Sequence, residues 1–258
     1  MISGFLLVNK APGITSSRVV QIIKKKFNLN KVGHLGTLDP MAAGLLIIAI
    51  NRATKFASLL LQSEKSYRAE VTLGIQTDTD DAEGKIISCK DVTINDLQAR
   101  KALLSFLGES YQFPPNFSAL KHKGKPLYKY ARDGIKIEKA ARRICIKNIN
   151  NISIKMPKVS FDINCSKGTY IRSIARDFGS RIGCGANLSK LVRTSQEKFL
   201  LSDACSLDEI SLKNLIPLEN AFDDLDSIHL NEIDSRAFLH GKSIEINLNH
   251  ENLLRVYD

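Results

Sequence analysis

The sequence predicts an α+β fold, and three observations support this. The chain has 258 residues and is 43% hydrophobic, enough for one substantial core or for a core with a small satellite domain. The expected strands and helices follow one another irregularly, without the strict βαβ order of a doubly wound sheet. No glycine-rich loop that cradles phosphates follows an expected strand. Dinucleotide-binding and P-loop folds are therefore disfavoured, and no nucleotide cofactor is expected.

The first elements follow from hydrophobic spacing and from capping residues. Residues 4–9 form an apolar run that is typical of a buried strand. Thr15 or Ser16 can cap a helix whose apolar side chains recur on one face. Residues 33–40 are expected to form a loop, and an apolar strand then ends at Ile50. The apolar positions of the helix are Val19, Ile23 and Phe27.

The middle of the chain continues with alternating patterns. Residues 54–62 are expected to form a short helix. Residues 65–73 alternate apolar and polar side chains, which predicts a half-buried strand. Thr93 and Asp96 resemble a capping box for a helix that runs to about Leu107. The apolar face of the expected strand consists of Tyr67, Ala69, Val71 and Leu73.

Two prolines at 114 and 115 stop regular structure, and residues 114–147 are expected to form a flexible basic insertion. Residues 161–165 are expected to form a strand. Lys167 and Gly168 then form a turn into a helix, on which two arginines four residues apart share a face. The buried side of this helix is expected to carry Ile171, Ile174 and Phe178, and the arginines are Arg172 and Arg176.

Charge is distributed unevenly along the chain. Residues 201–258 carry 12 acidic and 4 basic side chains, whereas residues 1–200 carry 15 acidic and 33 basic ones. The first 200 residues therefore have a net charge of +18 and the tail −8, within a total of +10. Lysine and arginine neutralise phosphates and release counterions, so the first part predicts polyanion binding, unless its charge serves only solubility.

The densest basic stretch is residues 121–147, with ten Lys and Arg side chains against two acids. Tyr128 and Tyr130 lie among them. Cations for phosphates beside rings for stacking favour RNA over a membrane, although a solvated charged face would have the same composition.

The cysteine pattern and the N-terminus favour a cytoplasmic protein. Five cysteines form no Cys-x-x-Cys pair, and an odd number cannot all close internal disulfides. Residues 1–5 lack the start of a signal peptide, and the longest apolar run, 42–50, is too short to span a bilayer. No metal site is expected, because the histidines outside the 33–40 block show no ligand spacing with the cysteines. These histidines are His122, His229, His240 and His250.

Residues 33–40, Gly-His-Leu-Gly-Thr-Leu-Asp-Pro, give the best indication of chemistry. Glycine permits backbone torsions that other residues resist, and Pro40 biases Asp39 away from helix. Asp39 is thus expected in a fixed, non-helical corner. Alternatively, Asp39 closes an Asx-type turn and His34 caps a strand, the more common fate of such residues.

This block resembles the active-site signature of the TruB family of tRNA pseudouridine synthases. Four further stretches match that family in the same order, and together they cover roughly the first 200 residues. They are Asn9-Lys10 with Gly13, Lys65-Ser66-Tyr67-Arg68, residues 114–121 (Pro-Pro-Asn-Phe-Ser-Ala-Leu-Lys) and residues 165–173 (Cys-Ser-Lys-Gly-Thr-Tyr-Ile-Arg-Ser).

The sequence departs from the family pattern at four positions. Leu35 and Met41 replace a threonine and a leucine that are common in the family, and they leave the reactive residues intact. Val192 stands where an arginine is frequent, and Glu197 stands at a usual glycine. These last two changes are expected to weaken or re-route nearby phosphate contacts, so Arg193 is a weaker candidate than Asp39.

The resemblance implies the pseudouridine synthase fold, a long curved mixed sheet flanked by helices with a central catalytic cleft. It implies a catalytic domain over residues 1–217, including the basic insertion. Residues 218–258 resemble only the beginning of the RNA-binding PUA domain that follows in this family. About 40 residues are few for an independent core, so this is expected to be a short, incomplete PUA-like region.

The resemblance also implies a reaction, the isomerisation of uridine 55 in the T-loop of tRNA to pseudouridine. The uracil leaves the ribose at N1 and rejoins it through C5 without net redox change, so no cofactor and no obligatory protein partner are expected. Asp39 would attack uracil C6 or ribose C1′, or act as a base in a glycal route. Arg172 would keep Asp39 charged and oriented, because burial raises a carboxyl pKa above ~3.9.

Five further site residues are implied by the same resemblance. Tyr67 would stack on the target base and help remove the C5 proton, while Tyr170 and Leu191 would line the uracil pocket. His34 would enter the RNA loop and displace the target nucleotide. Lys10 would support the Asp39 loop or a nearby phosphate. From the residues alone, core packing for the apolar positions and surface roles for the basic ones stay open.

Three other functions are considered. A tRNA-binding or tRNA-folding protein would need the charge distribution but not Asp39. An RNA-guided pseudouridine synthase subunit would share the aspartate motif, but the long insertion and the lack of extensive basic tails favour a stand-alone enzyme. A metal-dependent nuclease would need a cluster of ligands that the sequence does not offer.

Overall fold

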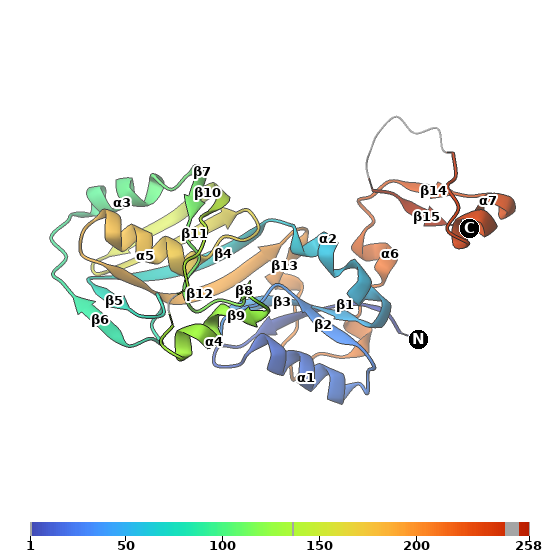
Figure 1. Cartoon of the computed structure of the whole chain (residues 1–258), viewed down its shortest axis with the longest axis horizontal. Coiled ribbons are helices and arrows are strands. Elements are labelled where there is room, and N and C mark those ends of the chain that lie inside the picture. The colour runs from blue at the N-terminus through green and yellow to red at the C-terminus, as the bar shows by residue number, and fades with distance from the viewer. Residues whose placement is uncertain (1, 136, 246–252, 258) are drawn as a thin grey trace.

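The computed structural model describes residues 2–135, 137–245 and 253–257. Its main element is a mixed sheet of nine strands flanked by helices (Figure 1). The strand order is β1-β3-β12-β4-β11-β10-β7, with β2 added beside β3 and β13 beside β12. The predicted α+β fold with a mixed sheet is confirmed.

The first elements are β1 (Gly4–Lys10), α1 (Ser16–Lys26), β2 (Val32–Leu35) and β3 (Ala43–Ile50). Thr15 caps α1 by accepting a hydrogen bond from the Arg18 amide, as one of the two predicted caps. Strands β1 and β3 pair antiparallel from Gly4 opposite Ile50 to Lys10 opposite Gly44. Hydrophobic side chains cover both faces of this pair, so the sequences of both strands are continuously apolar.

The prediction that residues 33–40 form one loop is wrong for their first part. Gly33 and His34 lie in β2, where His34 stands opposite Ile48 of β3. β12 covers only Ala43 and Gly44 of β3, and β2 pairs with residues 47–50 farther along the same edge. The loop begins at Gly36, whose φ of 87° is left-handed.

Two predicted helices are displaced. In place of one helix over 54–62, the chain forms a 3₁₀ helix, η1 (Asn51–Phe56), followed by α2 (Ala57–Leu61). Helix α3 (Asp96–Leu104) starts two residues later than Thr93 would place it. Its capping box joins Asn95 to Gln98, because Asn95 has the extended backbone that a cap needs.

The central strands build the rest of the sheet. β4 covers the predicted residues, and its apolar face is buried as expected. The helix predicted after Gly168 is α5, which buries its three predicted apolar positions. Several strands without a clear hydrophobic alternation escaped prediction. The elements are β4 (Lys65–Leu73), β5 (Ile75–Thr77), β6 (Ile86–Cys89), β7 (Gly108–Gln112), β10 (Arg142–Lys155), β11 (Lys158–Cys165), α5 (Ile171–Arg181), β12 (Ala186–Gln196) and β13 (Phe199–Leu200).

The basic insertion has regular structure. It contains the hairpin of β8 (Lys121–His122) and β9 (Lys125–Pro126), followed by α4 (Leu127–Arg132). Its last predicted residues, 142–147, belong instead to β10, which pairs with both β7 and β11. The insertion therefore ends before Arg142.

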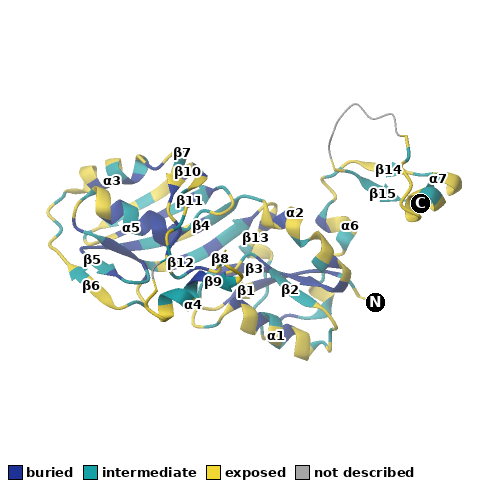
Figure 2. Ribbon diagram, in the orientation of Figure 1, coloured by how far each residue is buried: buried dark blue, intermediate teal, exposed yellow. Residues whose placement is uncertain are grey.

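Two hydrophobic clusters cover the two faces of the sheet at its β1–β3 end, where the strands are largely buried (Figure 2). The larger one lies under α1, α3 and α5 and includes Tyr67 and Leu191. The smaller one lies on the opposite face under η1 and α2 and includes Phe5 and Leu45. Alternate residues of β1 point into the two clusters, so the strand at this end is a buried central layer.

The tail is attached to the sheet through α6 (Leu218–Ala221), next to which the Phe222 ring packs against Phe5 with ring centroids 6.0 Å apart. Beyond it, β14 pairs in parallel with β15, and α7 leaves Ile233 and Leu239 exposed. The likeness to a PUA domain stays a prediction. The remaining elements are η2 (Leu201–Asp203), η3 (Leu212–Asn214), β14 (Ser227–His229), α7 (Glu232–Leu239) and β15 (Arg255–Tyr257).

Within the described residues, no helix has the length and apolar character needed to cross a bilayer.

Candidate active site

Asp39 lies in a bend between β2 and β3 that neighbouring segments hold in place. The Ser16 hydroxyl accepts a hydrogen bond from the Leu38 amide at 2.9 Å and donates one to the Leu38 carbonyl at 3.0 Å. On the other side, the Gly13 amide donates to the Pro40 carbonyl at 2.8 Å. The backbone on both sides of Asp39 is thus fixed, and the predicted non-helical corner is confirmed.

The carboxylate of Asp39 forms a two-pronged ion pair with Arg172. Arg172 Nε lies 2.8 Å from Asp39 Oδ2, and Arg172 Nη2 donates to Asp39 Oδ1 at 3.1 Å. The Asp39 side chain is 33% exposed, whereas the Arg172 side chain is 5% exposed. Solvent therefore reaches the carboxylate but hardly reaches the cation behind it.

The state of the carboxyl group depends on this pair. Burial raises the pKa of Asp39 above its ordinary value, and the charge of Arg172 opposes that rise. A second carboxylate, Asp81, adds to the rise. Arg172 is therefore the main group that favours the charged form of Asp39.

Arg172 is held by two other segments, the turn that contains Thr79 and Asp81 and the segment of Phe117. Its Nη1 donates to the Thr79 carbonyl at 3.1 Å, and its Nη2 donates to the Phe117 carbonyl at 2.8 Å. Asp81 Oδ2 lies 3.6 Å from Arg172 Nη1. The guanidinium is planar and has five donors in fixed directions, so these contacts set its orientation toward Asp39.

Asp81 is a site residue that the sequence did not single out. Its side chain is 6% exposed, and its Oδ1 accepts from the Thr79 hydroxyl at 2.6 Å and from the Glu83 amide at 3.1 Å. The available signal was the run of acids and threonines at 77–81 before Gly84. A Cβ at Gly84 would lie 2.2 Å from the Thr79 hydroxyl oxygen, so this turn requires glycine.

Replacement of Asp81 by asparagine is expected to slow catalysis by about 10- to 100-fold, the scale of losing one buried charged interaction. The amide keeps the shape of the carboxylate but loses the charge that faces Arg172. Single-turnover rates measure the effect, and the affinity for RNA should stay within about twofold. An unchanged rate would contradict a role of Asp81 in orienting Arg172.

Lys10 is fully buried and binds the Asp39 loop. Its Nζ donates to the Ile14 carbonyl at 2.7 Å, to Ala11 at 3.0 Å and to Pro40 at 3.3 Å. Burial lowers the pKa of Lys10 to about 8, and the charge of Asp39 opposes that shift. Of the two predicted roles, this geometry supports a contact with the loop.

Tyr67 is buried in the larger cluster, with its hydroxyl beside Arg193. Burial raises the pKa of Tyr67 to about 12, and the charge of Arg193 opposes that rise. Arg193 is itself 1% exposed, which makes it unavailable for the surface phosphate contact considered from sequence. Leu191 lies two residues earlier on β12 and belongs to the same cluster.

The other two predicted residues lie around this centre. The Tyr170 backbone precedes α5 and is held by Gln112 through hydrogen bonds of 2.8 and 3.1 Å. Burial raises the pKa of Tyr170, and the charge of Asp39 adds to that rise. His34 lies on β2, where burial and the charge of Arg193 lower its pKa.

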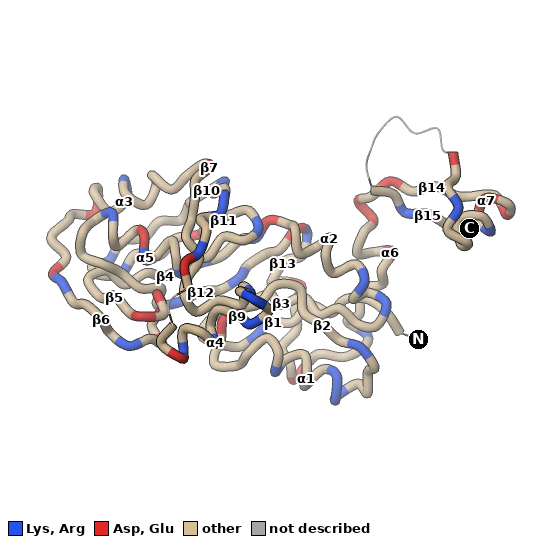
Figure 3. The backbone as a smooth tube through the Cα atoms, in the orientation of Figure 1, with Lys and Arg blue, Asp and Glu red and all other residues tan. Residues whose placement is uncertain are grey.

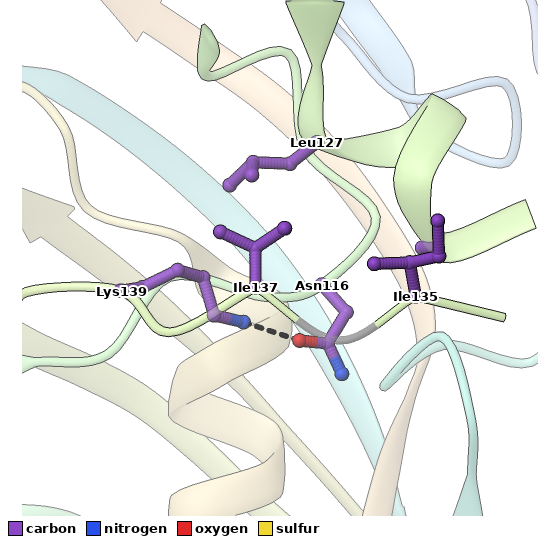
Figure 4. A pocket seen from close by; sticks show the side chains of 6 residues that line it. Asn116, Leu127, Ile135, Ile137 and Lys139 are labelled. Carbon is purple, nitrogen blue, oxygen red and sulfur yellow. Dashed lines mark hydrogen bonds between the residues drawn. The ribbon is translucent and has the colours of Figure 1, made fainter. Parts of the chain in front are cut away.

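The root of the basic insertion reaches the site through the Phe117 carbonyl, which accepts from Arg172. Next to it, the Lys139 ammonium donates to the Asn116 side chain beside a small apolar pocket (Figure 4). The pocket lies between α4 and the residues that follow it in the insertion, so the insertion packs on itself near the site. Its lining includes Leu127, Ala131, Ile135 and Ile137.

Comparisons with known proteins identify the family of the chain. The model of the TruB family pseudouridylate synthase N-terminal domain matches residues 24–171. tRNA pseudouridine synthase B of Alkaliphilus oremlandii is 44% identical, over 95% of this chain and 84% of that protein. The Thiobacillus denitrificans protein of the same name is 41% identical, over all of this chain and 89% of its own length.

Solved structures give the same result for the fold. A Cbf5-Nop10-Gar1 complex contains a chain with a TM-score of 0.71 and 29% identity, covering 92% of this chain and 67% of that one. A chain of an H/ACA ribonucleoprotein bound to a substrate RNA has a TM-score of 0.71 and 25% identity. The match covers 98% of this chain and 74% of that one. The chain belongs to the TruB family of pseudouridylate synthases, and it has the pseudouridine synthase fold.

Proposed function

We propose that this chain converts uridine 55 in the T-loop of tRNA to pseudouridine, with Asp39 as the nucleophile. The observation that supports this most directly is the Asp39–Arg172 pair, an accessible carboxylate oriented by a buried cation. Such a pair supplies a charged, aimed oxygen without a cofactor. The relatives named tRNA pseudouridine synthase B indicate tRNA as the substrate class.

In this proposal, the target nucleotide leaves the RNA stack before it reacts. Unstacking costs a few kcal/mol, which contacts in the site must offset. Tyr67 stacks on the uracil, Tyr170 and Leu191 line its pocket, and His34 takes the place of the displaced nucleotide. Lys10 holds the loop that presents Asp39. The reaction involves no net redox change, and the enzyme acts in the cytoplasm without a cofactor or protein partner.

The direct test is tritium release from C5-labelled uridine in an unmodified tRNA transcript, with no other protein or RNA added. The matched substrate carries cytidine in place of uridine 55. We expect release from the first transcript and none above background from the second. Release only after a guide RNA or partner proteins are added would support the RNA-guided alternative, and release from the cytidine transcript would exclude position 55.

RNA binding is assigned to the basic insertion and the surrounding sheet domain. Lysines and arginines are spread over that domain, whereas acidic side chains mark the start of the tail and α7 (Figure 3). Lys121, Lys123 and Lys129 are exposed on the insertion. Their side chains can approach phosphates without breaking the packing of the insertion.

Changing these three lysines to glutamine is expected to weaken tRNA binding and to reduce its salt dependence. For every phosphate that is no longer neutralised, the slope of log affinity against log salt should fall by about 0.7–0.9. Filter binding between about 50 and 200 mM salt gives the slope. Lys213→Gln, which removes an exposed lysine outside the insertion, is the control. Equal slopes for all variants would argue against this surface.

A further inference from the structure

Arg193 is among the largest side chains that are fully buried in the protein, and it is 1% exposed. Within the described residues, Arg193 forms no ion pair with a carboxylate, and the Tyr67 hydroxyl favours its charged form. Burial lowers the pKa of this guanidinium. A buried cation without a counterion is costly, so its retention at this position requires an explanation other than packing.

The guanidinium binds three oxygen atoms of the site. Arg193 Nε donates to the Leu45 carbonyl at 2.7 Å, and Nη2 donates to the Gly36 carbonyl at 3.1 Å. A third oxygen, the Tyr67 hydroxyl, lies beside the guanidinium, because Tyr67 of β4 stands opposite Arg193 of β12. Arg193 therefore connects β3, the turn that leads into the Asp39 loop, and the tyrosine on β4.

Two glycines make room for this residue. A Cβ at Gly36, where φ is 87°, would lie 3.2 Å from Arg193 Nη1. A Cβ at Gly44, where φ is 100°, would lie 2.4 Å from the Arg193 carbonyl oxygen and 2.8 Å from its amide nitrogen. The left-handed backbone and the close approach thus exclude a side chain at both positions. The glycines on either side of Asp39 in the sequence both serve the placement of Arg193.

The charge of Arg193 also affects the ionisation of neighbouring groups. It contributes to the lowered pKa values of Lys10, His34 and Lys65. A carboxylate beside Arg193 would cancel this influence and would compete for the N–H groups that hold the three oxygens. Because Arg193 has no carboxylate partner, its N–H groups stay available to position these oxygens.

We propose that Arg193 is a positioning residue for the isomerisation. Anchored on the Leu45 and Gly36 carbonyls, it orients the Tyr67 hydroxyl relative to Asp39. This inference rests on the proposed function. Arg193 does not touch the substrate, because its side chain is buried. It acts through Tyr67, so the effects of changing the two residues should depend on each other.

A double-mutant cycle in single-turnover tritium release tests this dependence, with Arg193→Met, Tyr67→Phe and the double variant. We expect Arg193→Met to slow the reaction by about 10- to 100-fold, the loss of one or two charged hydrogen bonds. The tRNA affinity should stay within about twofold. In the Tyr67→Phe background, where the hydroxyl is absent, the same change should cost less than about a third of its effect in the wild type.

Lys190→Met is the matched control, because Lys190 lies three residues earlier on β12 with a 71% exposed side chain. It removes the same charge from the same strand and should leave the rate unchanged. Arg193→Lys keeps the charge but lacks the planar guanidinium, whose donors reach these oxygens in fixed directions. It serves if the methionine variant does not fold, and it should still lose about tenfold in rate.

Effects that multiply in the double variant would overturn the proposal, as would a loss of tRNA affinity at an unchanged rate. A wild type that releases no tritium would refute the proposed function instead. The two failures are therefore distinguishable.

Discussion

Asp39→Asn is expected to abolish tritium release from tRNA while leaving tRNA binding intact. The amide has nearly the same shape as the carboxylate but cannot attack uracil or ribose. Enzymes that lose a covalent nucleophile are slowed by on the order of 10⁴-fold or more, so no product should rise above background. Single-turnover tritium release and filter binding, measured on the same transcript, separate the two effects.

The stability of this variant distinguishes lost chemistry from lost structure. Burial raises the pKa of Asp39, so the folded protein binds that proton more tightly than the unfolded chain. The carboxyl group therefore stabilises the fold at pH values below its pKa in the unfolded chain. This stabilisation is lost as the pH rises through the pKa of the folded protein. At neutral pH the carboxylate costs stability, and asparagine removes this cost.

We thus expect the melting temperature of Asp39→Asn at pH 7 to lie no more than about 3 °C below that of the wild type, which corresponds to about 1 kcal/mol. Arg172 still faces Asp81 and two carbonyls in the variant. A much lower melting temperature would mean that Asp39 serves the scaffold. Residual activity near the wild-type level would support the alternative of a tRNA-binding protein whose aspartate is dispensable.

Local patterns in the sequence were sufficient to predict the elements in which buried and exposed residues alternate regularly. The alternation in β4 gives both its bounds and its buried face, and the apolar spacing of α5 identifies the side that packs on the sheet. The non-helical backbone around Asp39 was predicted from glycine and proline, whereas its choice as the nucleophile came from the resemblance to the TruB family. These predictions depend on neighbours in the sequence, and the fold preserves them.

Long-range contacts account for what the sequence did not reveal. Strand β2 exists because β3 has an edge that β12 covers only in part. Asp81 matters because its turn packs against Arg172 from 91 residues earlier in the chain. Arg193 looked like a weak phosphate ligand because nothing local indicates that β12 runs through the middle of the sheet. A basic residue has the same local signature on a surface and in a buried network.

The second large effect is expected at Arg172, where two substitutions separate charge from geometry. Arg172→Lys keeps a positive charge but cannot bind both Asp39 oxygens and the carbonyls of Thr79 and Phe117 together. A misplaced reacting group can cost about 100-fold, so we expect at least about that loss in the single-turnover rate. Affinity for tRNA should change little, because the side chain is buried.

Arg172→Met removes the charge as well, and its rate should depend differently on pH. Without the guanidinium, burial of Asp39 is unopposed and the pKa of its carboxyl group rises further. Since the ionised form reacts, the rate should begin to fall at a higher pH than in the wild type as the solution is acidified. The lysine variant should keep its acid limb near that of the wild type. Rate profiles between pH 5 and 8, roughly the range in which folded proteins are most stable, compare the two variants. Coincident acid limbs for the lysine and methionine variants would show that Arg172 orients Asp39 without setting its charge.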